Sequence, residues 1–440
     1  MKKWLLLALM YGPALAGQVR PTEVGPPPVH LSFHDALQRA LQVNNDVERS
    51  RAEVPFAEAN RKYLLSQVLP HVAATGSTTR NSEEVKFGSG SDARTILPAN
   101  DWNYRIVLSQ PVFAGLREKR AYEQAKIGVL NAEQGVSGTE DAVLLRVAQS
   151  YLGVVDADAR IDIEKQNIAL AGKRREQANA FYQAGEVTKV DVLRAETAIK
   201  SAQRLLAVAE QNREDAMSRL RADLDLNTQI TVDHPTNPLP PLADEETLEA
   251  RAETSRPDVA QAANNVRISQ LEIQKQRGFW WPVVTFDAGM INQKSAFPAS
   301  KYGYGAFRFT VPLFQAGEVE SRVAQARERE LQSRLALETT KVNAREDVRR
   351  AFADLQAADT SLQLAKEQLA AAQAEYEQAF ELYRAQETTS LDLAASETAL
   401  ADARRVVAEE TLNHDLSQLR VWYAAGALKD AVGVQRSSVL

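Results

Sequence analysis

The sequence predicts a mainly α-helical protein in which long antiparallel coiled helices are accompanied by a small β part of four strands per chain. Proline is absent from the 123 residues between Pro111 and Pro235 and from the 128 residues after Pro312. Both stretches are rich in Ala, Leu, Glu, Gln, Arg and Lys, which favour helices. Each stretch follows a β-like segment ending in Pro-x-Phe, and the two segments are 201 residues apart, which indicates an internal duplication.

The 201-residue offset continues into the helical stretches. An apolar residue stands at every seventh position in both copies: Val147, Val154, Ile161 and Ile168 in the first, and Val348, Leu355, Leu362 and Leu369 in the second. A seven-residue apolar repeat predicts helices packed along a long, slightly left-handed seam. Helices of this length must bury their apolar stripes on one another and on other chains.

The sequence divides into six segments. They are a signal peptide (1–16), an extended proline-rich lead (17–30), a first repeat (31–226), a proline-rich linker (227–242), a second repeat (243–426) and a polar C-terminal tail (427–440). Each repeat is expected to contain one helix, two strands and two long helices, in that order.

Proline, glycine and capping residues set the bounds of the expected helices. The helices run from Leu31 to about Gln67, from Leu116 to Tyr182 and from about Thr188 to Leu226 in the first repeat, and from Gly317 to Tyr383 and from Thr389 to Tyr423 in the second. Ser32, with Asp35 three residues later, is the expected N-cap of the first helix. The second helix would extend about 100 Å, with Gly135 and Gly138 bending it or marking a join between two helices.

The N-terminus has the features of a secretory signal. Lys2 and Lys3 precede an apolar run of eight residues, and Ala14-Leu15-Ala16 offers an A-x-A cleavage site. The alternative, a membrane anchor, would need an apolar run of about 18–20 residues. The protein is therefore expected to be exported.

Composition argues against several classes of function. The 440 residues include no cysteine, which excludes disulfides, thiolate metal sites, cysteine nucleophiles and a lipidated cysteine. A net charge of −6 argues against a general nucleic-acid binder. The histidines are scattered without a metal-ligand pair; they are His30, His34, His71, His234 and His414. The sequence also lacks a P-loop, G-x-G-x-x-G and G-x-S-x-G, so we expect no enzyme, no metal and no cofactor.

The expected strands are rich in aromatic residues. Trp102, Tyr104 and Ile106 alternate with more polar residues, and the 37 residues from Gly278 to Phe314 include ten aromatics. Apolar strands with a polar opposite face and aromatic ends are typical of membrane β-barrels, although a soluble sheet packed on the helices remains an alternative. Because four strands cannot close a membrane barrel, several chains would have to share one.

In this arrangement the sequence resembles the TolC family of outer-membrane efflux channels from roughly Leu31 to Gly426. The likeness rests on the order, spacing and duplication of short motifs: Leu31-Ser32-Phe33-His34-Asp35-Ala36-Leu37, Asn44-Asn45-Asp46-Val47, Leu69-Pro70, Leu108-Ser109-Gln110-Pro111-Val112-Phe113-Ala114-Gly115 and Ser255-Arg256-Pro257-Asp258-Val259. The resemblance implies a homotrimer in the outer membrane of a Gram-negative cell, with four strands from each chain in one shared barrel. The helices would continue as a hollow tube across the periplasm.

The resemblance also implies a function and partners. Such a channel is the passive exit duct of a tripartite efflux pump or a type I secretion system, and it works with a periplasmic adaptor and, through it, an inner-membrane transporter. The sequence does not distinguish drug, metal and protein as the transported substrate. The alternative from another class is a periplasmic coiled-coil adaptor or structural protein without a membrane barrel.

The two helix turns at 182–193 and 383–394 align with each other and hold the candidate gate. In the family, the position of Asp392 lines the narrowest ring of the tube, and a tyrosine at the position of Tyr383 hydrogen-bonds towards the position of Asp191. A ring of three Asp392 carboxylates would attract cations. The alternative is helix capping alone, because Thr188 with Asp191 and Thr389 with Asp392 have capping-box spacing.

The turns also depart from the family and from each other. Thr388 stands where the best-known member has an arginine, and Ala395 stands where that member has a second acidic ring, so the gate is expected to be weaker or differently locked. Gly185 suits a left-handed helix C-cap, whereas Gln386 at the equivalent position does not. The two turns are therefore expected to differ in backbone.

Overall fold

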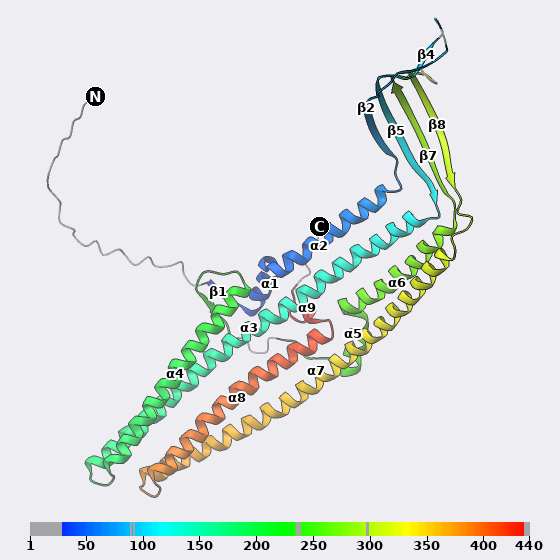
Figure 1. Ribbon diagram of the computed structural model, residues 1–440. Helices are drawn as coiled ribbons and strands as arrows, with labels where there is room; N and C mark the ends of the chain where they lie inside the picture. Colours follow the sequence, from blue (N-terminus) through cyan, green and yellow to red (C-terminus); the bar gives the residue numbers. More distant parts are fainter. Residues whose placement is uncertain (1–28, 89, 91–92, 235–238, 296–298, 435–440) are drawn as a thin grey trace, which may run out of the picture.

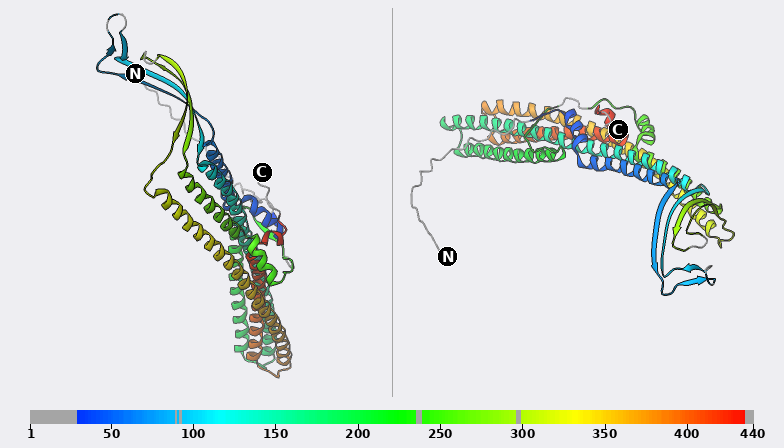
Figure 2. Two further views of the ribbon diagram at one scale, coloured as in Figure 1. Left: turned by 90° about the vertical axis from the view of Figure 1, so that its right-hand side faces the viewer. Right: turned by 90° about the horizontal axis from the view of Figure 1, so that it is seen from above.

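The computed structural model describes residues 29–88, 90, 93–234, 239–295 and 299–434. The predicted signal peptide (1–16) and most of the predicted lead lie outside these ranges. The molecule is a long, bent rod with a β-sheet at one end and the turns of two helical hairpins at the other (Figures 1 and 2).

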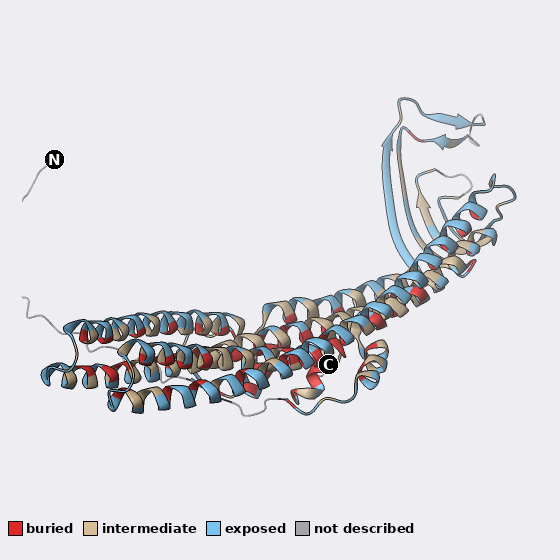
Figure 3. Ribbon diagram, turned by 90° about the horizontal axis from the view of Figure 1, so that it is seen from below, coloured by how far each residue is buried: buried red, intermediate tan, exposed pale blue. Residues whose placement is uncertain are grey.

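Four long helices form most of the rod and confirm the predicted mainly helical fold. They are α3 (Arg117–Gln183) and α7 (Glu318–Arg384), each of 67 residues, and α4 (Lys189–Asp223) and α8 (Ser390–Ala424), each of 35 residues. Helix α3 is continuous through Gly135 and Gly138, so neither glycine marks a join. Val147, Val154 and Val348 of the seven-residue pattern are fully buried, and Figure 3 shows such buried positions along the helices.

The first predicted helix is two helices in the structure. The short helices are α1 (Phe33–Val43) and α2 (Asn45–Ser66) in the first half, and α5 (Glu245–Ser255) and α6 (Pro257–Arg277) in the second. The break between α1 and α2 occurs because Asn44 is extended, with φ −73° and ψ 125°, and its side chain caps α2 by accepting the Asp46 N–H. Ser32 caps α1 as predicted, accepting the Asp35 N–H at 3.1 Å. A proline after Arg256 keeps that residue extended at the corresponding break.

A hydrophobic core in the middle of the rod includes the linker between the two halves. Strand β6 (Ile230–Val232) of this linker pairs in parallel with β1 (Val29–Leu31), a pairing that the sequence did not predict. The hydroxyl of Tyr151, a fully buried residue of α3, accepts the Asp233 N–H at 2.9 Å and lies 3.0 Å from the Leu31 carbonyl oxygen. Burial raises the pKa of Tyr151 to about 12. One side chain thus ties α3 to both short strands.

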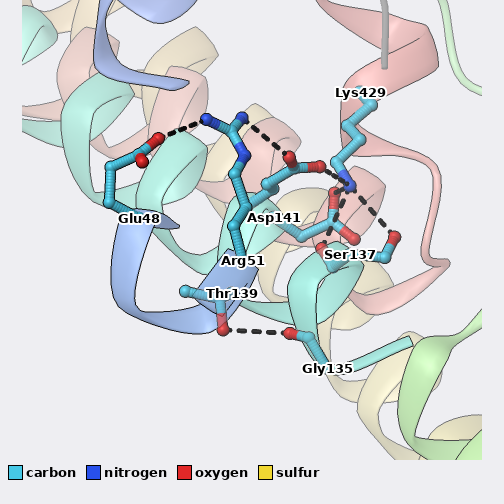
Figure 4. A network of polar contacts seen from close by, with 8 residues as sticks. Glu48, Arg51, Gly135, Ser137, Thr139, Asp141 and Lys429 are labelled. Atoms are coloured by element: carbon cyan, nitrogen blue, oxygen red, sulfur yellow. Dashed lines mark hydrogen bonds and ion pairs between the residues drawn. The ribbon is translucent and has the colours of Figure 1, made fainter. Parts of the chain in front are cut away.

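The beginning of the predicted polar tail is buried. After α8 the chain folds back in helix α9 (Leu428–Ala431), which packs against α3. The Lys429 ammonium lies 2.9 Å from a Glu140 oxygen and 3.7 Å from an Asp141 oxygen, and both carboxylates are buried (Figure 4). A buried cation paired with carboxylates holds this segment in place, so residues 427–434 are part of the core. Residues 435–440 lie outside the described ranges.

The sheet joins strands from both halves of the chain. It has four antiparallel strands in the order β2 (His71–Arg80), β5 (Asn100–Ala114), β7 (Val283–Gln293) and β8 (Lys301–Thr310), and a separate small hairpin is formed by β3 (Val85–Phe87) and β4 (Arg94–Leu97). The pairing of β5 with β7 joins the two halves. Within the described chain, β2 and β8 are free on their outer edges.

The register gives the sheet one mainly apolar face and one more polar face, on which Tyr302 and Tyr304 also lie. Residues paired across antiparallel strands point to the same side. One face carries Val72, Trp102, Tyr104, Ile106, Leu108, Phe286, Met290, Phe307 and Phe309, and the other carries Thr75, Ser77, Asn103, Arg105, Ser109, Asp287, Gln293 and Arg308. On the polar face the Ser109 hydroxyl donates to Asp287 at 2.7 Å, and Arg308 lies 3.3 Å from the same carboxylate.

The helices form a curved layer with two edges. Next to the sheet the contacting neighbours are α2, α3, α6 and α7 in that order, and in the hairpin half α3 lies between α4 and α8, with α7 beyond α8 (Figure 1). One edge of the chain is therefore formed by β2, α2 and α4, and the other by β8 and α7.

Candidate functional site at the tips of the helical hairpins

The turn between α3 and α4 lies beside the turn between α7 and α8 (Figure 1). Two side-chain hydrogen bonds connect them: the Gln386 amide donates to Glu186, and the Ser390 hydroxyl donates to Asp191. An open cleft of about 580 Å³ lies between the turns. The candidate residues Asp191, Tyr383, Thr188 and Thr389 line this cleft, together with Phe181, Glu186, Val187, Arg194, Gln386, Thr388, Ser390 and Leu391.

The two turns have the same backbone, which corrects the prediction from Gln386. Gly185 has a φ of +78° and Gln386 a φ of +63°, so both are left-handed. Each helix ends with the same pair of hydrogen bonds, including Glu186 N–H to Phe181 O at 2.9 Å and Glu387 N–H to the matching carbonyl at 2.8 Å. A left-handed non-glycine residue costs about 1–2 kcal/mol, and the hydrogen bond from Gln386 to Glu186 offsets part of that cost.

Thr389 and Asp392 form a capping box at the start of helix α8, as the capping interpretation predicted. The Thr389 hydroxyl accepts the Asp392 N–H at 3.2 Å, and the Asp392 carboxylate accepts the Thr389 N–H at 3.2 Å. Hydrogen bonds from the hydroxyls of Thr389 and Thr388 lower the pKa of Asp392. The carboxylate is exposed and is therefore held ionised at the end of the molecule.

Asp191 makes different hydrogen bonds from Asp392. Its carboxylate accepts hydrogen bonds from Ser390 of the other hairpin and from Thr188 at 3.0 Å, and the bond from Ser390 is the main reason that its pKa is lowered. Arg194 lies 3.6 Å from the same carboxylate. The Thr188 side chain accepts no backbone N–H, so the capping box predicted for Thr188 and Asp191 is not formed at the start of α4. Asp191 therefore connects the two hairpins.

Tyr383 does not make the hydrogen bond that the resemblance implied. Its side chain is 3% exposed and its ring packs edge-on against Phe181, with 5.5 Å between centroids. The hydroxyl has no hydrogen-bond partner among the described residues, and Asp191 accepts a hydrogen bond from Ser390. Burial and the nearby Asp191 charge raise the pKa of Tyr383. In this structure Tyr383 contributes by packing.

Two ion pairs further from the tip also join the hairpins, and the sequence did not predict them. Arg174 of α3 lies 2.7 Å from Glu397 of α8, and their side chains are 7% and 11% exposed. Arg405 of α8 donates to Glu164 of α3 at 2.8 Å. Burial raises the pKa of Glu397, while Arg174 acts in the opposite direction. No sequence signal separates these residues from charged residues on solvated faces.

The described residues form neither a cluster of metal ligands nor a membrane-spanning helix. Among the residues that the structure places, no three His, Asp or Glu side chains come together as metal ligands would. Within the same residues, no helix has a stretch both long and apolar enough to cross a membrane.

Comparisons with known proteins agree with the resemblance to TolC channels. The family model described as outer membrane efflux protein matches residues 36–224 and 248–427. The outer membrane efflux protein BepC of Brucella suis is 22% identical, over 97% of this chain and 88% of that protein. The pyoverdine export outer membrane protein OpmQ of Pseudomonas aeruginosa is 27% identical, over 88% of this chain and 79% of that protein.

Solved structures share the fold. The outer membrane channel CmeC of Campylobacter jejuni superposes with a TM-score of 0.74 at 17% identity, covering 90% of this chain and 86% of that one. The family match covers both halves of the chain, and it does not favour the alternative of a periplasmic adaptor or structural protein. The chain therefore belongs to the outer membrane efflux protein family and is an efflux channel of the outer membrane.

Proposed function

We propose that three copies of this chain form one passive exit duct, in which their sheets close a shared twelve-stranded barrel. The sheet supports this proposal most directly. Its edge strands β2 and β8 have ten residues each and pair with no further strand among the residues that the structure describes, and lipid does not tolerate unpaired strand edges. The apolar face would meet lipid and the polar face would line the lumen.

The helical rod would continue the duct across the periplasm of a Gram-negative cell. An adaptor in the periplasm and an inner-membrane transporter would supply substrate and energy, since the sequence offers no catalytic motif and the chain is proposed not to be an enzyme. Residues 1–16 would be removed on export. The similar lengths of the long helices support two copies of one unit, 31–226 and 243–426, joined by the linker 227–242.

The gate would lie at the hairpin tips. Asp392 is exposed, ionised and fixed by its capping box, so three copies around an axis would form an acidic ring that attracts cations. Asp191 would hold the tip closed through Ser390, and Tyr383 would do so by packing on Phe181. Gly185, Thr188 and Thr389 would shape the two turns.

Planar-bilayer recording and native mass measurement test this function together. The detergent-extracted protein should have the mass of a trimer, fractionate with the outer membrane and form discrete channels. Asp392→Asn should lower cation selectivity, measured as a smaller reversal potential in a salt gradient, whereas Glu186→Gln should change it less. A monomer in the soluble periplasm would refute the channel, and unchanged selectivity would refute the Asp392 ring.

A further inference from the structure

An unpaired cation stands on the polar face of the sheet. Arg105 belongs to the central strand β5, and its side chain is exposed. The register places it opposite Thr75 of β2 on one side and Ile291 of β7 on the other. Among the described residues it has no hydrogen-bond or ion-pair partner. A guanidinium that no carboxylate neutralises can bind an anion from solution.

The carboxylates of this face are too distant to neutralise Arg105. Asp101 lies four residues from Arg105 along β5, and Asp287 lies four residues from Ile291 along β7. At about 3.4 Å per residue, each of these strand positions is about 14 Å from Arg105. That distance exceeds the screening length of about 8 Å at physiological ionic strength. Asp287 also has its own cation, since Arg308 lies 3.3 Å from it.

The internal duplication explains the unmatched charge. Strands β2 and β7 begin 212 residues apart, and β5 and β8 begin 201 residues apart. By these offsets Thr75 corresponds to Asp287 and Arg105 to Ala306, and the register pairs the two members within each half. The second half has an acid where the first has threonine, and alanine where the first has arginine. Each chain therefore contributes one cation at this position.

Two tyrosines lie near Arg105 on the same face. Tyr302 pairs with Ile291, which pairs with Arg105, so their strand positions are about 10 Å apart. Tyr304 pairs with Gly289 of β7. A Cβ added at Gly289 would stand 3.0 Å from Cε1 of Tyr304, so the absence of a side chain there lets the tyrosine ring lie over β7. Aromatic surface and an unpaired cation are thus neighbours.

We propose that Arg105, Tyr302 and Tyr304 form a weak binding site for aromatic carboxylates or sulfonates inside the barrel. The acid group would contact the guanidinium, and the ring of the ligand would pack on the tyrosines. This inference rests on the proposed trimeric barrel, in which the polar face lines the lumen. Three copies of Arg105 would then form a cationic ring, and rings of arginine or lysine favour anions.

The site would give the two ends of the duct different charge. Asp392 carries an exposed carboxylate at the hairpin tips, whereas Arg105 carries an exposed guanidinium in the sheet at the other end of the rod (Figure 1). Binding at Arg105 is expected to be weak because the side chain is exposed. Weak binding suits a duct, since a solute that is held too tightly does not leave.

Channel block in planar bilayers tests the site. Naphthalenesulfonate, added on the side of the bilayer that the sheet faces, should lower the single-channel current in proportion to its occupancy. Arg105→Gln should weaken this block about two- to fivefold, the range for one exposed ion pair. The matched control Lys301→Gln removes a cation from the opposite face of the sheet, because Lys301 pairs with Asn292 and Asn292 with Tyr104. It should leave the block unchanged.

Inorganic phosphate separates the contribution of the tyrosines from that of the arginine. Phosphate has no ring, so Tyr304→Ser should weaken block by naphthalenesulfonate about two- to tenfold and leave block by phosphate unchanged. Arg105→Gln should weaken block by both anions. Block by naphthalenesulfonate that is as strong in Arg105→Gln as in the unaltered channel, or an equal loss in Lys301→Gln, would overturn the site.

Cysteine modification tests the charge within one folded variant, because the chain has no native cysteine. In assembled Arg105→Cys channels, a methanethiosulfonate reagent that carries trimethylammonium should restore block by naphthalenesulfonate, whereas one that carries sulfonate should not. If the cationic reagent lowers the conductance but fails to restore block, the site is refuted and the channel stands. A monomeric mass, or no channels from the unaltered protein, would refute the proposed duct itself.

Discussion

Replacing Arg174 by Met should weaken the connection between the two hairpins, and the loss should depend on pH. Arg174 and Glu397 lie 2.7 Å apart with side chains 7% and 11% exposed. Removing one partner should therefore lower the free energy of unfolding by about 3–5 kcal/mol, as in buried ion pairs, rather than by the smaller amount typical of exposed pairs. We expect about 3 kcal/mol, near the lower limit, because Glu397 can take up a proton once the guanidinium is removed.

The sign of the pH dependence follows from the pKa of Glu397. Burial already raises that pKa above its ordinary value of 4.5, and Arg174 opposes the rise. A carboxyl whose pKa is higher in the folded than in the unfolded state stabilises the folded protein at pH values below the unfolded-state pKa. This stabilisation is lost as the pH rises through the folded-state pKa. Without Arg174 the folded pKa rises further, so the variant should lose most stability at about pH 8 and less at about pH 5.

Denaturant unfolding of the detergent-solubilised assembly, followed by circular dichroism, measures this loss. Arg174→Met/Glu397→Gln should recover most of the stability, because the double variant leaves no buried charge. Arg160→Met removes an arginine that pairs with Asp156 within α3 and serves as a control. A loss equal to that of the control, or one that is the same at both pH values, would refute the reasoning.

Four further substitutions give independent tests. Gln386→Gly should stabilise the protein by about 1 kcal/mol in thermal unfolding because glycine adopts a left-handed backbone without strain. A loss of stability would mean that the hydrogen bond from Gln386 to Glu186 outweighs that strain. Tyr383→Phe should leave closed-state conductance unchanged, since the hydroxyl lacks a partner among described residues; increased leakage would restore the hydrogen-bond hypothesis. Tyr151→Phe should cost about 0.5–1.5 kcal/mol by removing the hydrogen bond between the Tyr151 hydroxyl and the Asp233 N–H, a loss that denaturant unfolding would detect. Lys429→Met should cost about 3–5 kcal/mol and expose the chain end to protease, and unchanged protease resistance would contradict its role in the core.

The predictions that succeeded depend on periodic or local chemistry. The length of the long helices follows from proline placement. The capping box of Thr389 and Asp392 has the spacing that predicted it, whereas the same spacing at Thr188 and Asp191 gives no side-chain cap. The break at Asn44 was missed because an asparagine can cap a helix or lie within one, and the sequence alone does not distinguish the two. The left-handed Gln386 was missed because neighbouring structure overrides the intrinsic preference for glycine.

Interactions between residues far apart in sequence could not be predicted. Strand β6 has only three residues and becomes a strand because Tyr151 and β1 meet it in the core. Lys429 follows a long helix and precedes a polar stretch, so its burial depends on carboxylates nearly 300 residues away. The pairing of Ser390 with Asp191 likewise arises only when the two hairpins lie side by side.

The two ends of the described chain both lie at mid-rod, since β1 and α9 pack into the same central core (Figure 1). A fluorescent protein or affinity tag joined at either end would therefore project from the side of the channel, at the middle of the rod. Both mouths of the duct would stay clear of it. A label attached at the middle of the rod can therefore report on crowding around the tube without blocking the path of the transported substrate.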